Sequence, residues 1–311
     1  MNVEVMGAVA GFLRSRDAMV ELDNDRLYFK EESLADFYDF CRDHMDVERM
    51  AVRTSEQAEW KPFGLVPDML GAEWVDRLIT ENRIEPWAQP IIDRNGELFA
   101  HEMLARFVRP EGGLQSPFEV FGAAKLRDRV YALDRMCRMA AIRSAVHLPK
   151  KVFINFVPTS IYSPAHCLQS TVALAQELGF HSSKFVFEVV ESEEVGDIAH
   201  LKSILEYYKA GGFQYALDDV GEGFSTAQML RDITPHYMKL DKSYVQGVAG
   251  DPDKQEMAAQ MLTMALELGS VPLAEGIEAE EDYEWLREQG FELFQGYWFA
   301  RPAPIARAVR Q

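Results

Sequence analysis

Residues 215–225 read YALDDVGEGFS, an apolar run that ends in two adjacent aspartates, Asp218 and Asp219. The pair stands where a buried strand is expected to end. Adjacent carboxylates repel each other and lose much solvation when they are buried, so a positive charge is expected beside them. This stretch therefore predicts a strand whose carboxyl end meets a cationic partner.

Seven further apolar runs, rich in Val, Ile and Phe, accompany this one from about residue 84 onward. The eight runs are EPWAQPIID (85–93), LFAHEMLAR (98–106), KVFINFV (151–157), KFVFEVVE (184–191), FQYALDDV (213–220), YMKLDKSYV (237–245), VPLAEGI (271–277) and FELFQGYWF (291–299). Segments of helical period lie between them, the clearest at 116–148, 170–180, 199–212, 253–269 and 279–290. This alternation of nearly continuous apolar strands with helices predicts a parallel sheet that is buried on both faces.

Two α/β architectures fit this alternation, an open doubly wound sheet and a TIM-like (β/α)8 barrel. No glycine-rich phosphate loop follows the first strand, so the usual signature of an open-sheet nucleotide binder is missing. A closed barrel brings the carboxyl ends of all its strands around one point. Polar residues stand in or at the end of separate apolar runs, which favours the barrel: Glu102, Asn155, Glu188, Asp218, Asp219, Lys239, Glu275 and Gln295.

Residues 1–83 differ from the rest and predict a small N-terminal α+β extension, leaving residues 84–311 for the barrel. Residues 19–29 read as a hairpin with an Asp-Asn-Asp turn, and residues 33–45 as an amphipathic helix capped by Ser33. Residues 67–82 read as a helix that leads into the barrel. The extension is interpreted as a structural cover for the barrel, with a small sensory or dimerisation module as the alternative.

Composition excludes several function classes. The formal net charge of −18 provides no basic field for a DNA or RNA polymer. No apolar stretch approaches the roughly 18 residues of a membrane span, and the first residues do not read as a signal peptide, so a cytoplasmic protein with no membrane partner is expected. Three widely separated cysteines, Cys41, Cys137 and Cys167, suggest neither zinc nor disulfides.

The strand-end acids and the asparagine form an all-oxygen set, which suits Mg2+ or Mn2+ better than softer metals. So many acids could not remain ionised in a barrel mouth without cations. Two divalent ions are therefore expected to hold the set together and to activate a water molecule.

In sequence order, the motifs HEMLAR, NFVPTSIY, FEVVES, LDDVGEGFS, MKLDKSYV, AEGIE and FQGYWFARP resemble those of the EAL-domain family of cyclic di-GMP phosphodiesterases. The resemblance covers roughly residues 84–304. It implies metal ligation by Glu102, Asn155, Glu188, Asp218 and Asp219. It implies catalytic roles for Glu275, Lys239, Gln295 and Glu191, the last holding the metal-binding loop that Ser225 closes. Contact with substrate is implied for Gln89, Leu104 and Arg106, with Arg106 on a phosphate.

The sequence departs from the family pattern at a few positions. Met103 and Ala105 replace an alanine and a leucine, and Val220 and Glu222 replace a phenylalanine and a threonine of the Asp-Asp loop. None is an expected ligand. Met103 adds volume beside Glu102, which is expected to lower the rate if it shifts that side chain, and the role of Glu222 has no explanation.

The resemblance implies hydrolysis of cyclic di-GMP to linear pGpG by a two-metal mechanism, with a homodimer expected. A non-catalytic cyclic di-GMP receptor that signals through its N-terminal segment is the first alternative. A scaffold that binds a protein partner and keeps the acids as a relic is the second.

Overall fold

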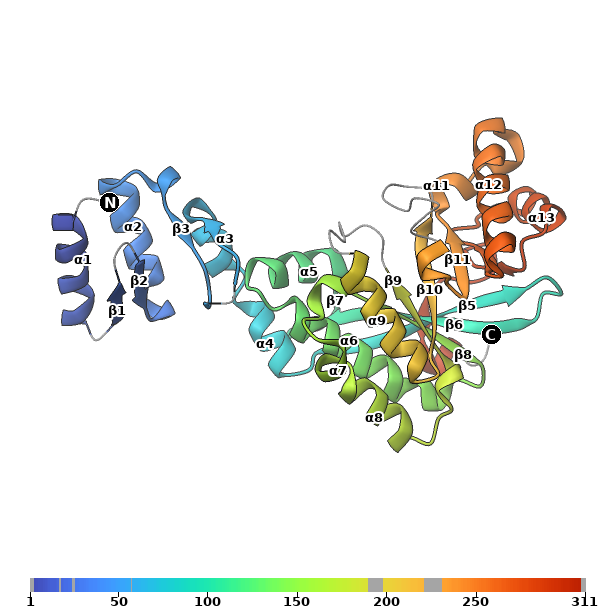
Figure 1. Cartoon of the computed structure of the whole chain (residues 1–311), viewed down its shortest axis with the longest axis horizontal. Helices are drawn as coiled ribbons and strands as arrows, with labels where there is room; N and C mark the ends of the chain where they lie inside the picture. Colours follow the sequence, from blue (N-terminus) through green and yellow to red (C-terminus); the bar gives the residue numbers. More distant parts are fainter. Residues whose placement is uncertain are drawn as a thin grey trace. The chain divides into compact units, whose positions relative to one another are not determined.

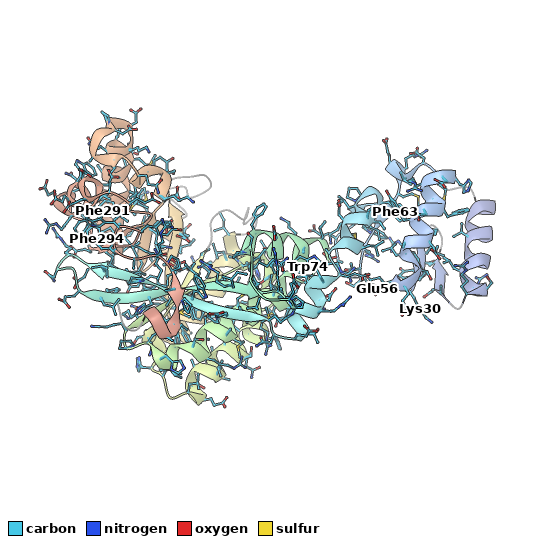
Figure 2. All side chains as sticks on the ribbon, turned by 180° about the vertical axis from the view of Figure 1, so that it is seen from behind. Lys30, Glu56, Phe63, Trp74, Phe291 and Phe294 are labelled. Carbon is cyan, nitrogen blue, oxygen red and sulfur yellow. The ribbon has the colours of Figure 1, made fainter. Side chains whose placement is uncertain are left out.

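The computed structural model describes residues 3–16, 18–23, 26–56, 58–189, 198–220 and 231–308. The chain folds into two compact units, Met1–Arg77 with Phe121–Arg129, and Leu78–Val120 with Val130–Gln311. Each unit has a core of its own. Figure 2 labels one core side chain of the first unit, Phe63, and two of the second, Phe291 and Phe294.

The N-terminal unit is a small α+β assembly. Its elements are α1 (Val3–Ser15), β1 (Met19–Asp23), β2 (Arg26–Phe29), α2 (Leu34–His44), β3 (Ala51–Val52), β4 (Lys61–Pro62), α3 (Val66–Gly71) and most of α4 (Trp74–Thr80). Strands β1 and β2 pair antiparallel, which confirms the hairpin expected at 19–29. The core of this unit packs Phe37 of α2 between Phe29 and Phe63, with ring centroids 5.0 and 5.9 Å away. The unit thus buries an apolar centre of its own.

Two helix predictions in this region are corrected. Ser33 precedes α2, but its side chain makes no capping hydrogen bond, because a 3-10 turn over Glu31–Ser33 already leads into the helix. Residues 67–82 form two short helices, α3 and α4, in place of one. Ala72 and Glu73 lie in the turn between them.

The larger unit is a closed barrel, because β5 pairs with both β6 and β13. Figure 1 labels its strands from β5 to β11. Among the described residues, eight strands close the ring: β5 (Ile84–Asp93), β6 (Leu98–Val108), β8 (Lys151–Phe156), β9 (Phe185–Val189), β10 (Gln214–Val220), β11 (Tyr237–Leu240), β12 (Val271–Ala274) and β13 (Leu293–Phe294). Each corresponds to one of the eight apolar runs, so the TIM-like α/β barrel is confirmed. Short strands β7 (Leu114–Gln115) and β14 (Ala303–Pro304) flank β6 and β5.

One strand does not run with the others. β5 is antiparallel to both β6 and β13, whereas neighbouring strands from β6 to β13 are parallel. The expectation of a fully parallel sheet is wrong here, because the short loop between β5 and β6 can join only antiparallel strands. Asp93 closes that loop by accepting hydrogen bonds from the backbone N–H groups of Asn95 and Glu97 at 2.8 and 3.0 Å.

Helices follow most strands and cover the barrel. They are α6 (Val130–Ser144), α7 (Pro164–Cys167), α8 (Gln169–Glu177), α9 (Ile198–Ala210), α11 (Lys242–Val245), α12 (Pro252–Leu268), α13 (Glu280–Gln289) and α14 (Ile305–Ala308). Helix α5 (Pro117–Leu126) is divided between the two units at Val120. The helical segment expected at 116–148 is broken between α5 and α6, where Asp128 has a left-handed φ of 55°. No helix in the described ranges is both long and apolar enough to cross a membrane.

Local sequence explains where elements begin and end. Asp251 caps α12 by accepting from the backbone N–H groups of Asp253 and Lys254, and Gly269 ends the helix at φ 69°. Asp241 accepts from the N–H of Ser243 at 2.7 Å and starts α11. This cap ends β11 at Leu240, well before the end of the apolar run 237–245.

The interior of the barrel contains an apolar layer. One side chain from each ring strand contributes, and all are at least 96% buried: Ile91, Ala100, Phe153, Val186, Ala216, Tyr237, Leu273 and Leu293. We call this set the apolar layer. Since side chains alternate between the two faces of a strand, the next inward-facing position is two residues away. The apolar layer therefore fixes which residues form the layer above it.

Candidate active site

The layer above the apolar layer is polar on every strand. On the parallel strands, the residues two positions after the members of the apolar layer are Glu102, Asn155, Glu188, Asp218, Lys239, Glu275 and Gln295. On β5, which runs in the opposite direction, the residue at the same level is Gln89, two positions before Ile91. We call these eight residues the polar layer. Six are buried, and Asn155 and Glu275 are partly exposed. The period of the strands thus brings most of the predicted site residues to one level of one barrel.

In one half of the polar layer, Lys239 forms ion pairs with three carboxylates. Its ammonium lies 2.7 Å from a carboxylate oxygen of Asp218 and 3.0 Å from one each of Glu188 and Glu275. The side chain is 1% exposed. Three carboxylates from β9, β10 and the end of β12 therefore share one cation.

In the other half, the Glu102 carboxylate accepts hydrogen bonds from two side-chain amides. One of its oxygens accepts from the Asn155 amide at 2.9 Å, and the other accepts from the Gln295 amide at 2.5 Å. Gln295 also donates to the Gln89 side chain at 3.2 Å, and Gln89 donates to the carbonyl of Ala300 at 3.1 Å. These amides hold the Glu102 carboxylate in place.

The site has more negative charge than Lys239 can balance. Burial raises the pKa of Glu188 well above its ordinary value, and the nearby Glu102 and Asp218 raise it further, against the lowering effect of Lys239. Burial likewise raises the pKa of Glu275 to about 8. Burial alone would lower the pKa of Lys239, but the four surrounding carboxylates raise it well above its usual range. These raised pKa values indicate that additional positive charge would stabilise the ionised form of the carboxylates.

The donor set fits divalent cations. Its oxygen ligands are those that Mg2+ and Mn2+ prefer. Glu188 is fully buried, and within the described ranges its second carboxylate oxygen has no hydrogen-bond partner. Among the same residues no three Asp, Glu, His or Cys side chains are arranged to hold an ion as they stand, since the Lys239 ammonium lies between three of them. The residues that could approach an ion are Glu102, Asn155, Glu188 and Asp218.

Leu104 and Arg106 continue along the inward face of β6 above Glu102. The Arg106 guanidinium lies 5.3 Å from the ring centroid of Trp87, an aromatic that the sequence motifs did not single out. Burial lowers the pKa of Arg106, while Glu102 and Tyr297 oppose that shift. Trp87 lies two residues from Gln89, so the same two-residue period could have identified it as facing the site.

Four residues singled out in the sequence are not placed with the others. Glu191 and Ser225 lie outside the described residues, as does Glu222. Asp219 belongs to β10, but its side chain is not among those described. Met103 is placed, and it is 4% exposed in the core between the sheet and the helices. It therefore points away from the polar layer, and the expectation that its added volume lowers the rate stays a prediction.

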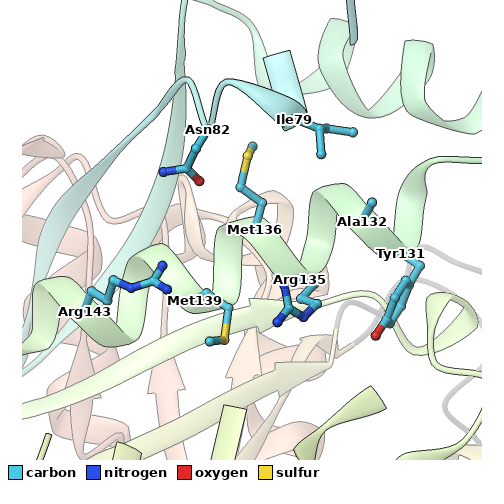
Figure 3. Close-up of a pocket in the computed structure, with 8 residues that line it drawn as sticks. All are labelled: Ile79, Asn82, Tyr131, Ala132, Arg135, Met136, Met139 and Arg143. Carbon is cyan, nitrogen blue, oxygen red and sulfur yellow. The ribbon is translucent and has the colours of Figure 1, made fainter. Parts of the chain in front are cut away.

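A separate pocket of about 760 Å³ lies on the outside of the barrel. Figure 3 shows Arg135, Met136, Met139 and Arg143 of α6 lining it, with Ile79 and Asn82 opposite. No residue of the polar layer contributes to it. It is a feature distinct from the candidate active site.

Comparison with known proteins agrees with this geometry. The model of the EAL domain family matches residues 72–302. The chain is 30% identical over 248 residues to the probable cyclic di-GMP phosphodiesterase PdeG of Escherichia coli (strain K12), and the match covers 76% of this chain and 48% of that protein. It is 30% identical over 253 residues to the cyclic di-GMP phosphodiesterase PA2567 of Pseudomonas aeruginosa, covering 79% and 42%. The chain thus spans about half or less of the length of these relatives.

A solved structure of similar fold is the standalone versatile EAL protein from Vibrio cholerae O395 in its c-di-GMP bound form. The TM-score is 0.65 and the identity 36%, over 71% of this chain and 92% of that one.

Proposed function

Because the chain belongs to the EAL domain family, we propose that it hydrolyses one phosphodiester bond of cyclic di-GMP and releases linear pGpG. The observation that carries this proposal is the polar layer, in which Lys239 joins carboxylates from three strands. The names of the relatives supply the substrate, and the match of 36% identity is to a protein solved with c-di-GMP.

Two ions, Mg2+ or Mn2+, would be held by Glu102, Asn155, Glu188, Asp218 and Asp219. When bound, such ions lower the pKa of a water molecule and neutralise charge on the phosphate oxygens. The four carboxylates that surround a single ammonium in the described part of the site support this assignment.

The chain's own residues position the reactants. We assign Lys239, which forms ion pairs with three carboxylates, the role of orienting the attacking water. Glu275, whose carboxylate lies 3.0 Å from the Lys239 ammonium, is assigned the role of proton acceptor. Gln295 holds Glu102 through its amide. Glu191 is assigned the loop-holding role that the family motif implies.

Substrate contacts are assigned to the inward face of β6 and the neighbouring strand. Arg106 offers a guanidinium that can bind a phosphate through two parallel hydrogen bonds, and its place against Trp87 limits its freedom. Leu104 offers apolar contact, and Gln89 a polar group that the Ala300 carbonyl fixes.

The remaining features are also proposals. The N-terminal segment 1–83 is assigned a structural or regulatory role, the protein is expected to act in the cytoplasm, and a homodimer is the expected assembly.

The test is product analysis with a matched pair of variants. Purified wild type is incubated with cyclic di-GMP in EDTA, Mg2+ and Mn2+, and the products are separated by chromatography. Linear pGpG is expected only with metal. Glu102→Gln is expected to abolish it, because the amide keeps the shape but loses the charge that a metal ion requires.

Glu97→Gln is the control, since Glu97 is an exposed carboxylate in the hairpin between β5 and β6. It is expected to turn over like wild type. Full activity of Glu102→Gln would overturn the assignment of the site. Tight calorimetric binding of cyclic di-GMP without any product in metal would make the protein a receptor instead.

A further inference from the structure

Helix α6 contains a charged pair that is completely buried. Asp134 and Arg138 lie one turn apart, their side chains are 2% and 0% exposed, and the Arg138 Nε donates to Asp134 Oδ2 at 2.8 Å. Neither residue lines the pocket of Figure 3, and Asp134 accepts a hydrogen bond from the backbone that follows β8. The pair therefore faces the barrel.

The bonds of the pair lead to two other elements. Arg138 donates to the Thr171 hydroxyl of α8 at 2.6 Å. Asp134 Oδ1 accepts from the backbone N–H of Val157 at 3.0 Å, and the Ser160 Oγ lies 3.4 Å from Asp134 Oδ2. Ser160 in turn donates from its hydroxyl and from its N–H to the carbonyl of Val157, at 2.8 and 3.1 Å. Asp134 thus fixes the turn in which the chain leaves β8.

That turn begins two residues after Asn155. Between them Phe156 is 1% exposed and packs against the rings of Phe187 and Tyr208. Asn155 itself donates to Glu102 at 2.9 Å. The backbone between Asn155 and Val157 is therefore held on one side by apolar packing and at its end by the Asp134 carboxylate.

Stability alone does not explain the pair. Removing two charges from water costs more than a single ion pair usually returns, and well-packed apolar residues of similar volume commonly stabilise a protein at least as well. An apolar pair could pack α6 against α8 and the sheet. It could not accept the hydrogen bond from Val157.

We propose that Asp134 is a positioning residue for Asn155: by accepting the Val157 N–H it sets where β8 ends and holds the Asn155 amide beside Glu102. The hydrogen bond from Arg138 holds the Asp134 carboxyl group aimed at that N–H group. The importance of Asn155 as a metal ligand rests on the proposed function. Residues that orient ligands in this way commonly change metal affinity by about tenfold or more when they are replaced.

The test compares two double variants that carry the same charge. Asp134→Leu with Arg138→Met replaces the ion pair by apolar side chains of similar size. Asp134→Asn with Arg138→Met also removes both charges but retains a side-chain oxygen that can accept from Val157. Thermal unfolding confirms that both are folded, and Asp282→Leu serves as a control, because Asp282 is another buried acid that accepts from backbone N–H groups, those of Gly247 and Ala249.

Two readouts are made. Mn2+ binding is measured by calorimetry, and hydrogen exchange of the Val157 amide by NMR. The leucine variant is expected to bind Mn2+ at least about tenfold more weakly and to exchange Val157 faster, while the asparagine variant stays close to wild type in both. Asp282→Leu is expected to change neither.

Equal Mn2+ affinity in the two double variants would overturn the proposal, whether both bind like wild type or both bind equally more weakly. If wild type binds no Mn2+ and makes no product, the proposed function fails. The exchange of Val157 and the NMR signals of the Asn155 amide then still test the positioning role, and identical spectra in the two double variants would refute it.

Discussion

The apolar layer and the polar layer lie two residues apart on the same eight strands, yet they make opposite contributions. The apolar layer buries aliphatic and aromatic groups from every strand, which favours folding. The polar layer buries carboxylates, an ammonium and amides at nearly the same depth, which disfavours folding wherever the charges are not balanced. The apolar layer therefore stabilises the fold, and this stabilisation offsets the cost of burying the charged and polar groups of the polar layer.

The first and largest expected effect is in the polar layer. Glu188→Gln should lower turnover of cyclic di-GMP by at least about a thousandfold, or about 4 kcal/mol in the barrier, because a neutral amide cannot balance a bound cation. It should not lower the free energy of unfolding measured by urea in EDTA, since it removes one of the four carboxylates around Lys239. Activity is measured by chromatography of pGpG at saturating Mn2+.

If the Glu188→Gln variant were less stable than wild type by more than about 1 kcal/mol, the contrast between a stabilising apolar layer and a destabilising polar layer would not hold. It would mean that the carboxylate is retained for the fold. Retained turnover would instead remove Glu188 from the metal site.

The sequence predicted the eight strands well because each apolar run is long enough to span the sheet, and their number favours a barrel. It did not reveal the direction of β5, since an apolar run has no polarity and only the short Asp93–Glu97 loop determines it. The ends of β11 and of α5 depend on single residues, Asp241 and Asp128, whose bonds form only in the folded chain.

The residues of the candidate site were also predicted from the sequence, but their arrangement in space was not. Acids and amides at strand ends are visible in the sequence, but their position in a single layer emerges only when the strand period is counted from a buried neighbour. The outward direction of Met103 follows from the same count, since it adjoins Glu102. Asp134 and Arg138 could not be recognised, because a charged pair one turn apart on a helix usually indicates a solvated face.

The second prediction concerns the apolar layer. Phe153→Ala removes a fully buried ring that lies 5.0 Å from the ring of Tyr237. The free energy of unfolding should fall by about 3 kcal/mol, because the ring leaves a cavity. Turnover per folded molecule, measured at low temperature, should fall much less than in Glu188→Gln.

An unchanged urea midpoint in Phe153→Ala would contradict the role of the apolar layer as the support of the barrel. A loss of turnover as large as that of Glu188→Gln in a fully folded sample would show that the two layers do not act separately.

The smallest effect is expected from a residue of neither layer. Met103 neighbours Glu102 in the sequence but packs in the core between the sheet and the helices. Met103→Leu nearly conserves volume, so the free energy of unfolding should change by less than about 1.5 kcal/mol and turnover should stay within about twofold of wild type. If the leucine variant instead gained or lost turnover by about tenfold at unchanged stability, Met103 would act on the Glu102 side chain through the strand, and the separation between the inner and outer faces of β6 would not hold.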